Sequence, residues 1–276
     1  MQPMSVGIML GVGDDPNTSF EKAKSVGVDN VQMGCPPDQY FTPDAQEDLK
    51  QAISASGIMI TTVFCGFVGE SYADIPTVKR TVGYVPADSR AERIEKTKRI
   101  SDFAKNLGVY QIAAHAGFIP ENHSDPLYPV MVKTMQEIAD YVVGNGQIFA
   151  LETGQETAPA LLSFLTDVNR GNVKVNFDPA NMILYGSGEP IEALELLKDF
   201  IVSVHCKDGK WPTEDNQLGV ETPLGDGDVG MDRFVNKLKE IGYHGPLTIE
   251  REISGGQQLR DLIKAKELLE NLRDGE

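Results

Sequence analysis

The sequence lacks several features that mark particular classes of protein. Its three cysteines, Cys35, Cys65 and Cys206, are scattered without a CxxC pair, which argues against a disulfide framework or a thiolate zinc site. Basic residues are few, because 25 Lys and Arg stand against 41 Asp and Glu, for a net charge of -16. Since phosphate binding depends mainly on Lys and Arg, this deficit argues against a nucleic-acid or anionic-membrane surface.

Long hydrophobic runs are also missing. No apolar stretch approaches the length of a bilayer span, and the amino terminus shows no signal-peptide pattern. These absences predict a soluble, cytoplasmic protein. No shift of composition and no flexible linker marks a boundary, so residues 1–276 are expected to form a single domain.

Eight short β-branched runs alternate with helical patterns along the chain. Strands separated by helices pair in parallel, so the pattern predicts an α/β fold, a single (β/α)₈ TIM barrel. Strands are expected at 5–10, 28–33, 58–64, 109–116, 147–152, 173–178, 201–206 and 246–252. Helices are expected near 18–26, from 42 onward, and near 90–107, 130–143, 157–169, 189–199, 230–241 and 257–272.

The stretch VKVNFDPAN, residues 173–181, indicates where the chemistry lies. Apolar and polar side chains alternate along it, and Asp178 ends its polar face just before Pro179 stops the strand. An ordinary Asp-Pro turn would give the same letters. However, the neighbouring strands end their polar faces in the same way, at Glu152, His205 and Glu250. Three carboxylates and one imidazole suit one divalent ion such as Mn²⁺, Mg²⁺, Co²⁺ or Zn²⁺.

Further candidates surround this set. His115 closes the fourth strand on its inward face, which favours substrate binding or general-acid catalysis. Trp211, the only tryptophan, follows His205 in a long loop, where it would stack on a sugar or merely pack the loop. Residues 66–89 are long for a barrel loop and are expected to form a lid, with Phe67, Tyr72 and Tyr84 shielding the substrate.

Several motifs resemble the xylose-isomerase-like TIM barrel superfamily, and within it the branch of sugar-phosphate isomerases and epimerases. They are LETG at 151–154, FDPANM at 177–182, VHCKD at 204–208, and GDGDVG followed by GYHGPLTIERE. By resemblance to the ketose 3-epimerases, Glu152, Asp178, His205 and Glu250 would hold Mn²⁺ or a similar ion. Glu152 and Glu250 would also be the catalytic pair, moving a proton on and off a carbon beside the substrate carbonyl. Relatives are often dimers or tetramers, so the resemblance allows a homo-oligomer.

Two positions depart from the ketose 3-epimerase pattern. Asn181 stands where those enzymes carry a histidine, and Lys207 and Lys210 stand where an arginine is expected. Substrate recognition is therefore expected to differ, with Asn181, Lys207, His115 and Trp211 as the substrate-binding candidates. Endonuclease IV-like members of the superfamily use a histidine-rich zinc site, which four histidines and the acidic balance disfavour.

The expected activity is that of a metal-dependent isomerase or epimerase of a small sugar or keto-sugar. A divalent ion stabilises the enolate formed beside a carbonyl, and two carboxylates serve as base and acid. The same enolate can instead expel a leaving group, so a lyase or dehydratase of an inosose or 3-keto-sugar is the alternative. A non-catalytic sugar-binding barrel would not need both glutamates.

Overall fold

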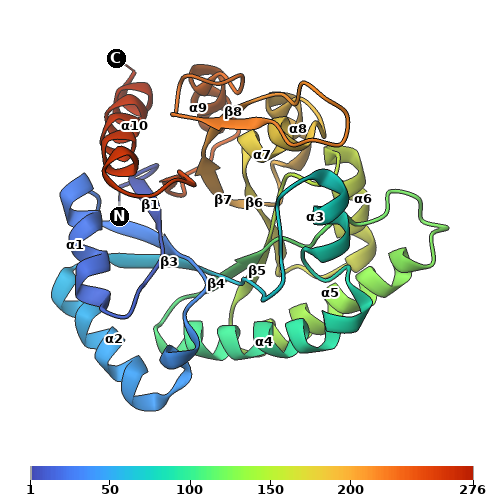
Figure 1. Ribbon diagram of the computed structural model, residues 1–276, viewed down its shortest axis with the longest axis horizontal. Helices are drawn as coiled ribbons and strands as arrows, with labels where there is room; N and C mark the ends of the chain where they lie inside the picture. The colour runs from blue at the N-terminus through green and yellow to red at the C-terminus, as the bar shows by residue number, and fades with distance from the viewer. Residues whose placement is uncertain (1, 276) are drawn as a thin grey trace.

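Eight parallel strands close into a barrel in the computed structural model, which describes residues 2–275 (Figure 1). The order around the barrel is β1-β10-β7-β6-β5-β4-β3-β2, and this confirms the predicted (β/α)₈ fold. The barrel strands are β1 (Val6–Leu10), β2 (Asn30–Met33), β3 (Met59–Phe64), β4 (Gln111–Ala114), β5 (Ile148–Glu152), β6 (Val173–Phe177), β7 (Ile201–Cys206) and β10 (Leu247–Ile249).

A ring of helices surrounds the strands (Figure 1). Its members are α1 (Pro16–Val26), α2 (Pro43–Ser56), α4 (Ala87–Asn106), α5 (Leu127–Gly144), α6 (Ala158–Val168), α8 (Pro190–Leu197), α9 (Met231–Glu240) and α10 (Gly256–Asp274). Local chemistry fixes their ends; the Thr42 hydroxyl, for example, accepts from the Ala45 N–H at the start of α2. Among the helices of residues 2–275, none is long and apolar enough to cross a membrane.

Short elements absent from the sequence-based expectation lie in the connections that follow the strands. They are η1 (Asp38–Phe41), α3 (Ile75–Thr81), α7 (Pro179–Tyr185) and a hairpin of β8 (Asp208–Lys210) and β9 (Val220–Thr222). In Figure 1, α3 and α7 lie inside the ring of outer helices. The carboxyl ends of barrel strands are the usual place for an active site, and these additions are built around that end.

The alternation of side chains along β6 places two kinds of residue on its two faces. Val173, Val175 and Phe177 belong to the main apolar core, in which strands and helices pack together. Asn176 is also fully buried but is polar, as are Gln32 and other inward-facing residues. The barrel interior therefore holds a polar layer beneath the strand ends.

The long segment after β3 is anchored to the outer helix α4, which carries Arg93. The Arg93 guanidinium donates to the backbone carbonyls of Thr81 and Gly83, at 2.8 and 2.6 Å. Tyr84 is 0 % exposed in the core, so the expectation that its ring shields a substrate is wrong. Tyr72 does lie near the candidate site, with its ring centroid 5.8 Å from that of His115.

Close packing of β1 against β2 gives a test of the fold. A Cβ at Gly7 would lie 2.1 Å from Asn30 Oδ1 and 2.9 Å from Asn30 O, so Gly7→Ala must displace a buried side chain. We expect a loss of about 1–3 kcal/mol in the free energy of unfolding, measured by urea denaturation. Gly13→Ala is the control, because a Cβ there meets no atom within 4 Å. Equal urea midpoints for Gly7→Ala and Gly13→Ala would contradict the close packing of β1 against β2.

Candidate metal centre

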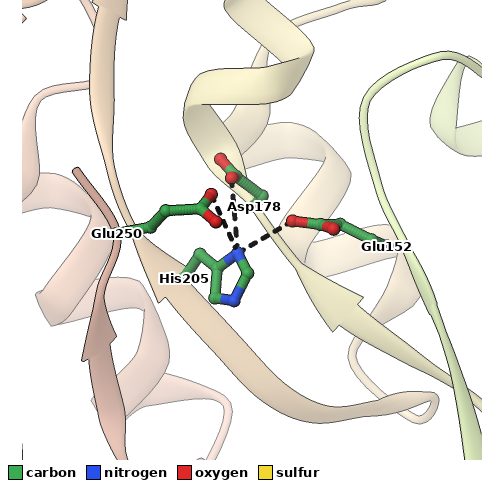
Figure 2. A group of neighbouring side chains, drawn as sticks. All are labelled: Glu152, Asp178, His205 and Glu250. Atoms are coloured by element: carbon green, nitrogen blue, oxygen red, sulfur yellow. Dashed lines mark ion pairs between the residues drawn. The ribbon is translucent and has the colours of Figure 1, made fainter. Parts of the chain in front are cut away.

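Four side chains from four neighbouring strands converge at the mouth of the barrel. Glu152 ends β5, Asp178 follows β6, His205 lies on β7 and Glu250 follows β10. One ligand atom from each lies within 4.8 Å of the others (Figure 2). The structure thus brings together all four residues that the sequence analysis selected.

His205 lies at the centre of this cluster and is 0 % exposed. Its Nδ1 is 2.8 Å from Glu152 Oε1, 3.3 Å from Glu250 Oε2 and 3.6 Å from Asp178 Oδ2. Despite these distances, neither Nδ1 nor Asp178 Oδ2 has a hydrogen-bond partner among residues 2–275. Buried polar atoms are rarely left in this way, and several such lone pairs directed at one point suit a cation. The residues therefore fit a divalent metal ion.

The charge balance of the cluster supports the same conclusion. Burial alone would lower the pKa of His205, but the nearby carboxylates of Glu250, Glu152 and Asp178 raise it well above its ordinary value. Burial raises the pKa of Asp178, and nearby Lys207 and His205 only partly offset this. Three carboxylates around one nitrogen repel one another, and a divalent ion bound between them would neutralise this negative charge.

The backbone around Asp178 is fixed by its own hydrogen bonds. Asp178 Oδ1 accepts from the Asn181 N–H at 2.9 Å and caps α7, with Pro179 in the first turn. The Thr153 hydroxyl accepts from the Asp178 N–H at 2.8 Å. The Asp-Pro sequence thus begins a helix rather than an ordinary turn, and this cap leaves Oδ2 directed at His205.

Lys207 and Asn181 brace the cluster from one side. Lys207 is 2 % exposed, and its ammonium lies 3.1 Å from Glu250 Oε2, 3.0 Å from Glu252 Oε1 and 3.2 Å from Asn181 Oδ1. The ammonium donates hydrogen bonds to Glu250 and Asn181 and forms an ion pair with Glu252. Asn181 Nδ2 in turn donates to Glu152 Oε1 at 3.4 Å. Lys210, the other lysine of this motif, is exposed on β8.

His115 braces Glu152 from the other side. Its Nε2 lies 3.0 Å from Glu152 Oε2, and its Nδ1 lies 3.2 Å from Gln155 Nε2. An amide nitrogen can only donate, so Nδ1 accepts and the proton of a neutral His115 is on Nε2, facing the carboxylate. Trp211 lies farther along the chain, just after β8, and is 37 % exposed. Within residues 2–275, no hydrogen bond or aromatic contact joins its indole to the cluster.

Asp208 organises the loop after β7 and was not selected from the sequence. Its carboxylate is buried and accepts from four backbone N–H groups, those of Gly209, Gly225, Gly227 and Val229. A Cβ at Gly227 would lie 2.1 Å from Asp208 Oδ1, so only glycine fits there. Asp226 and Asp228, on either side of Gly227, are exposed.

Glu156 is a second buried acid that the sequence analysis did not select. It follows β5, is 5 % exposed, and its Oε1 accepts from the Ile119 N–H at 2.9 Å. Burial raises the pKa of Glu156 to about 8. Its place one residue after Gln155, whose amide contacts His115, puts it beside the candidate site.

A profile of the xylose isomerase-like TIM barrel family matches residues 20–274. The chain belongs to this family. A xylose isomerase domain protein from Planctomyces limnophilus is similar to it over 99 % of this chain and 98 % of that chain, with a TM-score of 0.95 and 45 % identity. An uncharacterized protein of Methanocaldococcus jannaschii is 26 % identical over 172 residues, which span 57 % of this chain and only 54 % of that relative.

More distant solved structures share the fold of the family. A D-tagatose 3-epimerase-like protein has a TM-score of 0.76 and 22 % identity, over 98 % of this chain and 97 % of that chain. The probable 3-DHS dehydratase AsbF from Bacillus anthracis has a TM-score of 0.72 and 18 % identity, over 96 % of this chain and 99 % of that chain. At these identities the likeness establishes a common fold.

Metal analysis of an Asp178→Asn variant tests the centre. The amide can still accept from the Asn181 N–H and cap α7, but the variant loses one negative charge directed at His205 Nδ1. After chelation and reconstitution we expect about one equivalent of Mn²⁺ or Zn²⁺ in the wild type and much less in the variant. Asp226→Asn, at an exposed loop position, should keep the metal. Undiminished metal in Asp178→Asn would contradict this assignment.

Glu156 gives a pH-dependent prediction. The unfolded chain ionises near the ordinary value of 4.5, whereas the folded chain keeps the proton up to about 8. The folded state therefore binds more protons between these values, and the free energy of unfolding falls as the pH rises. Each pKa unit corresponds to about 1.4 kcal/mol, so Glu156→Gln should gain several kcal/mol over the wild type above pH 8 and little below pH 4.5. Denaturation curves that stay parallel across this range would contradict the shift.

Proposed function

We propose that the protein is a divalent-metal-dependent isomerase or epimerase of a small sugar or keto-sugar. The observation that carries the proposal is the placement of two glutamates. Glu152 and Glu250 approach His205 from opposite sides, with Asp178 between them (Figure 2). A carbon held between these carboxylates has a proton acceptor on one face and a donor on the other, which is what inversion requires.

Proton removal beside a carbonyl needs stabilisation of the enolate. A divalent ion held by Glu152, Asp178, His205 and Glu250 would supply Lewis-acid polarisation of the substrate oxygens. The protein's own side chains transfer the proton and hold the two glutamates in position. Glu250 takes the proton in one direction of reaction and Glu152 in the other, while Lys207 and His115 hold these two carboxylates in place.

Substrate recognition is assigned to residues around the glutamates. Asn181 lies against both Glu152 and Lys207, so a bound hydroxyl would exchange for one of these hydrogen bonds. His115 faces the same space, and Tyr72 packs beside its ring. Trp211 would reach the substrate only from the edge of the loop after β8. A neutral or weakly charged sugar suits this acidic mouth and the net charge of -16.

A lyase or dehydratase is the second candidate. The enolate formed by the same proton removal can expel a group from the adjacent carbon, which would give an unsaturated product from an inosose or a 3-keto-sugar. The shared fold of the probable 3-DHS dehydratase supports keeping this outcome, since that protein has a TM-score of 0.72 to this chain. Both activities would use the same pair of glutamates, so only the identity of the product distinguishes an isomerase from a lyase.

Deuterium exchange tests both candidates. In D₂O with Mg²⁺, a panel of ketoses, inososes and 3-keto-sugars is followed by NMR. Deuterium in recovered or epimerised sugar supports the isomerase, and an unsaturated product supports the lyase. Glu250→Gln should slow exchange by about 10²–10⁴-fold, whereas Glu214→Gln, at an exposed position in the loop between β8 and β9, should exchange at nearly the wild-type rate. The proton-transfer proposal fails if every panel member exchanges as slowly with the wild type as with Glu250→Gln.

A further inference from the structure

A line of buried polar side chains runs through the barrel interior below the candidate metal centre. His205 Nε2 lies 3.0 Å from Gln32 Oε1, and Gln32 Nε2 lies 3.3 Å from Asn176 Oδ1. Asn176 Oδ1 also accepts from the Ser203 hydroxyl at 2.5 Å, and Ser203 Oγ accepts from Gln111 Nε2 at 2.7 Å. The line joins β6 and β7, which are neighbours in the barrel, to β2 and β4, which lie farther around it.

These hydrogen bonds converge on Asn176 Oδ1 from two sides. Gln111 donates to Ser203, and both Ser203 and Gln32 donate to Asn176 Oδ1. With its amide nitrogen engaged in this way, Gln32 can present only its oxygen to His205. In the neutral imidazole that a metal ion requires, the His205 proton is then on Nε2, and the lone pair is on Nδ1, which faces the three carboxylates.

The position of Gln32 makes it well suited to this task. It is 1 % exposed and His205 is 0 % exposed, so water does not compete for either group. The ring of Phe64 stacks on the imidazole, with centroids 5.2 Å apart and planes 26° apart, and limits its tilt. Gln32 therefore decides which nitrogen carries the proton, and Phe64 helps to hold the ring.

We propose that Gln32 is a positioning residue that fixes the Nε2–H tautomer of His205 and thereby sets the metal affinity of the centre. Asn176 and Ser203 set the direction of the Gln32 amide. The inference rests on the proposed metal centre, because it concerns the nitrogen that the centre would use. Gln32 does not touch the metal position itself; it acts through His205 alone.

Metal affinity is the first readout. Zn²⁺ binding is measured by competition with a chromophoric chelator, without substrate. Gln32→Met has a similar length, but its thioether is only a weak hydrogen-bond acceptor, so we expect affinity to fall by about 10- to 100-fold. Gln32→Glu restores an acceptor, and Asn176 can turn its Nδ2, which has no partner in residues 2–275, toward it. This second variant should keep wild-type affinity, which separates loss of the acceptor from simple disturbance of the core.

The matched control is Thr248→Val. Thr248 lies on β10 beside His205 in the ladder, is fully buried, and its hydroxyl has no hydrogen-bond partner in the described part of the chain. Removing this hydroxyl alters the same interior layer without touching the line of hydrogen bonds. The variant should bind Zn²⁺ as the wild type does. Ser203→Ala, three hydrogen bonds away from the histidine along the line, should lose less affinity than Gln32→Met.

The histidine tautomer is the second readout. The chain has only four histidines, so ¹⁵N-labelled His205 can be assigned by comparison with a His205→Asn variant. In the Zn²⁺-loaded wild type we expect a slowly exchanging proton on Nε2 and none on Nδ1. In Gln32→Met that proton should exchange faster because its acceptor is gone. A proton on Nδ1 in the loaded wild type would overturn the proposal.

The outcomes separate this inference from the metal centre on which it rests. If the wild type binds no metal, the centre itself is wrong. If the wild type binds Zn²⁺ and Asp178→Asn does not, the centre stands, and equal affinities for wild type and Gln32→Met then overturn the role of Gln32 alone. Equal losses in Gln32→Met and Gln32→Glu would also overturn it, since the acceptor would not be the property that matters.

Discussion

Negative charge concentrated in a buried place is the constraint on which the mouth of this barrel depends. Glu152, Asp178 and Glu250 direct oxygens at one nitrogen of His205, in a region shielded from water. Three carboxylates brought so close together repel one another strongly where the effective dielectric constant is low. The arrangement persists only if positive charge lies among them, and the buried Lys207 supplies part of it. A divalent ion would supply the rest. Relief of the repulsion between the carboxylates would then contribute to the affinity of the site for the ion.

Different neighbouring residues hold the cluster from different sides. Lys207 and Asn181 fix one side, and His115 with Gln155 fixes the other. Below, the polar line through Gln32 reaches the histidine from inside the barrel. Both glutamates contact His205, but their other neighbours differ, since Glu250 contacts the Lys207 ammonium and Glu152 contacts the His115 imidazole. Such asymmetry is how a protein gives two carboxylates different roles in acid–base chemistry.

The barrel strands and most of the candidate site could be predicted from the sequence, because both follow from the alternation of polar and apolar residues along each strand. The eight strands and the inward phase of Glu152, Asp178 and His205 follow from the two-residue repeat, and the structure agrees. The helix α7 was missed because Asp-Pro has the same letters in a turn and at a helix start. Gln32 was missed because its partners lie on strands distant in sequence, and no local pattern records a contact such as that with Asn176. Tyr84 was misplaced because an aromatic ring in a loop can face either the mouth or the core.

The loop gathered around Asp208 has a consequence for how this scaffold can change its substrate. Lys207 lies between β7 and β8 and its side chain enters the site, whereas the side chain of the next residue, Asp208, accepts from four backbone amides of the loop. Inserting or deleting a residue there would exchange the two and dismantle both the brace and the loop. Gly227 leaves no room for a larger residue either. Natural or engineered variation in specificity is therefore expected to accumulate in residues 66–75, where Val68 is 91 % exposed and Tyr72 reaches His115, rather than in residues 207–229.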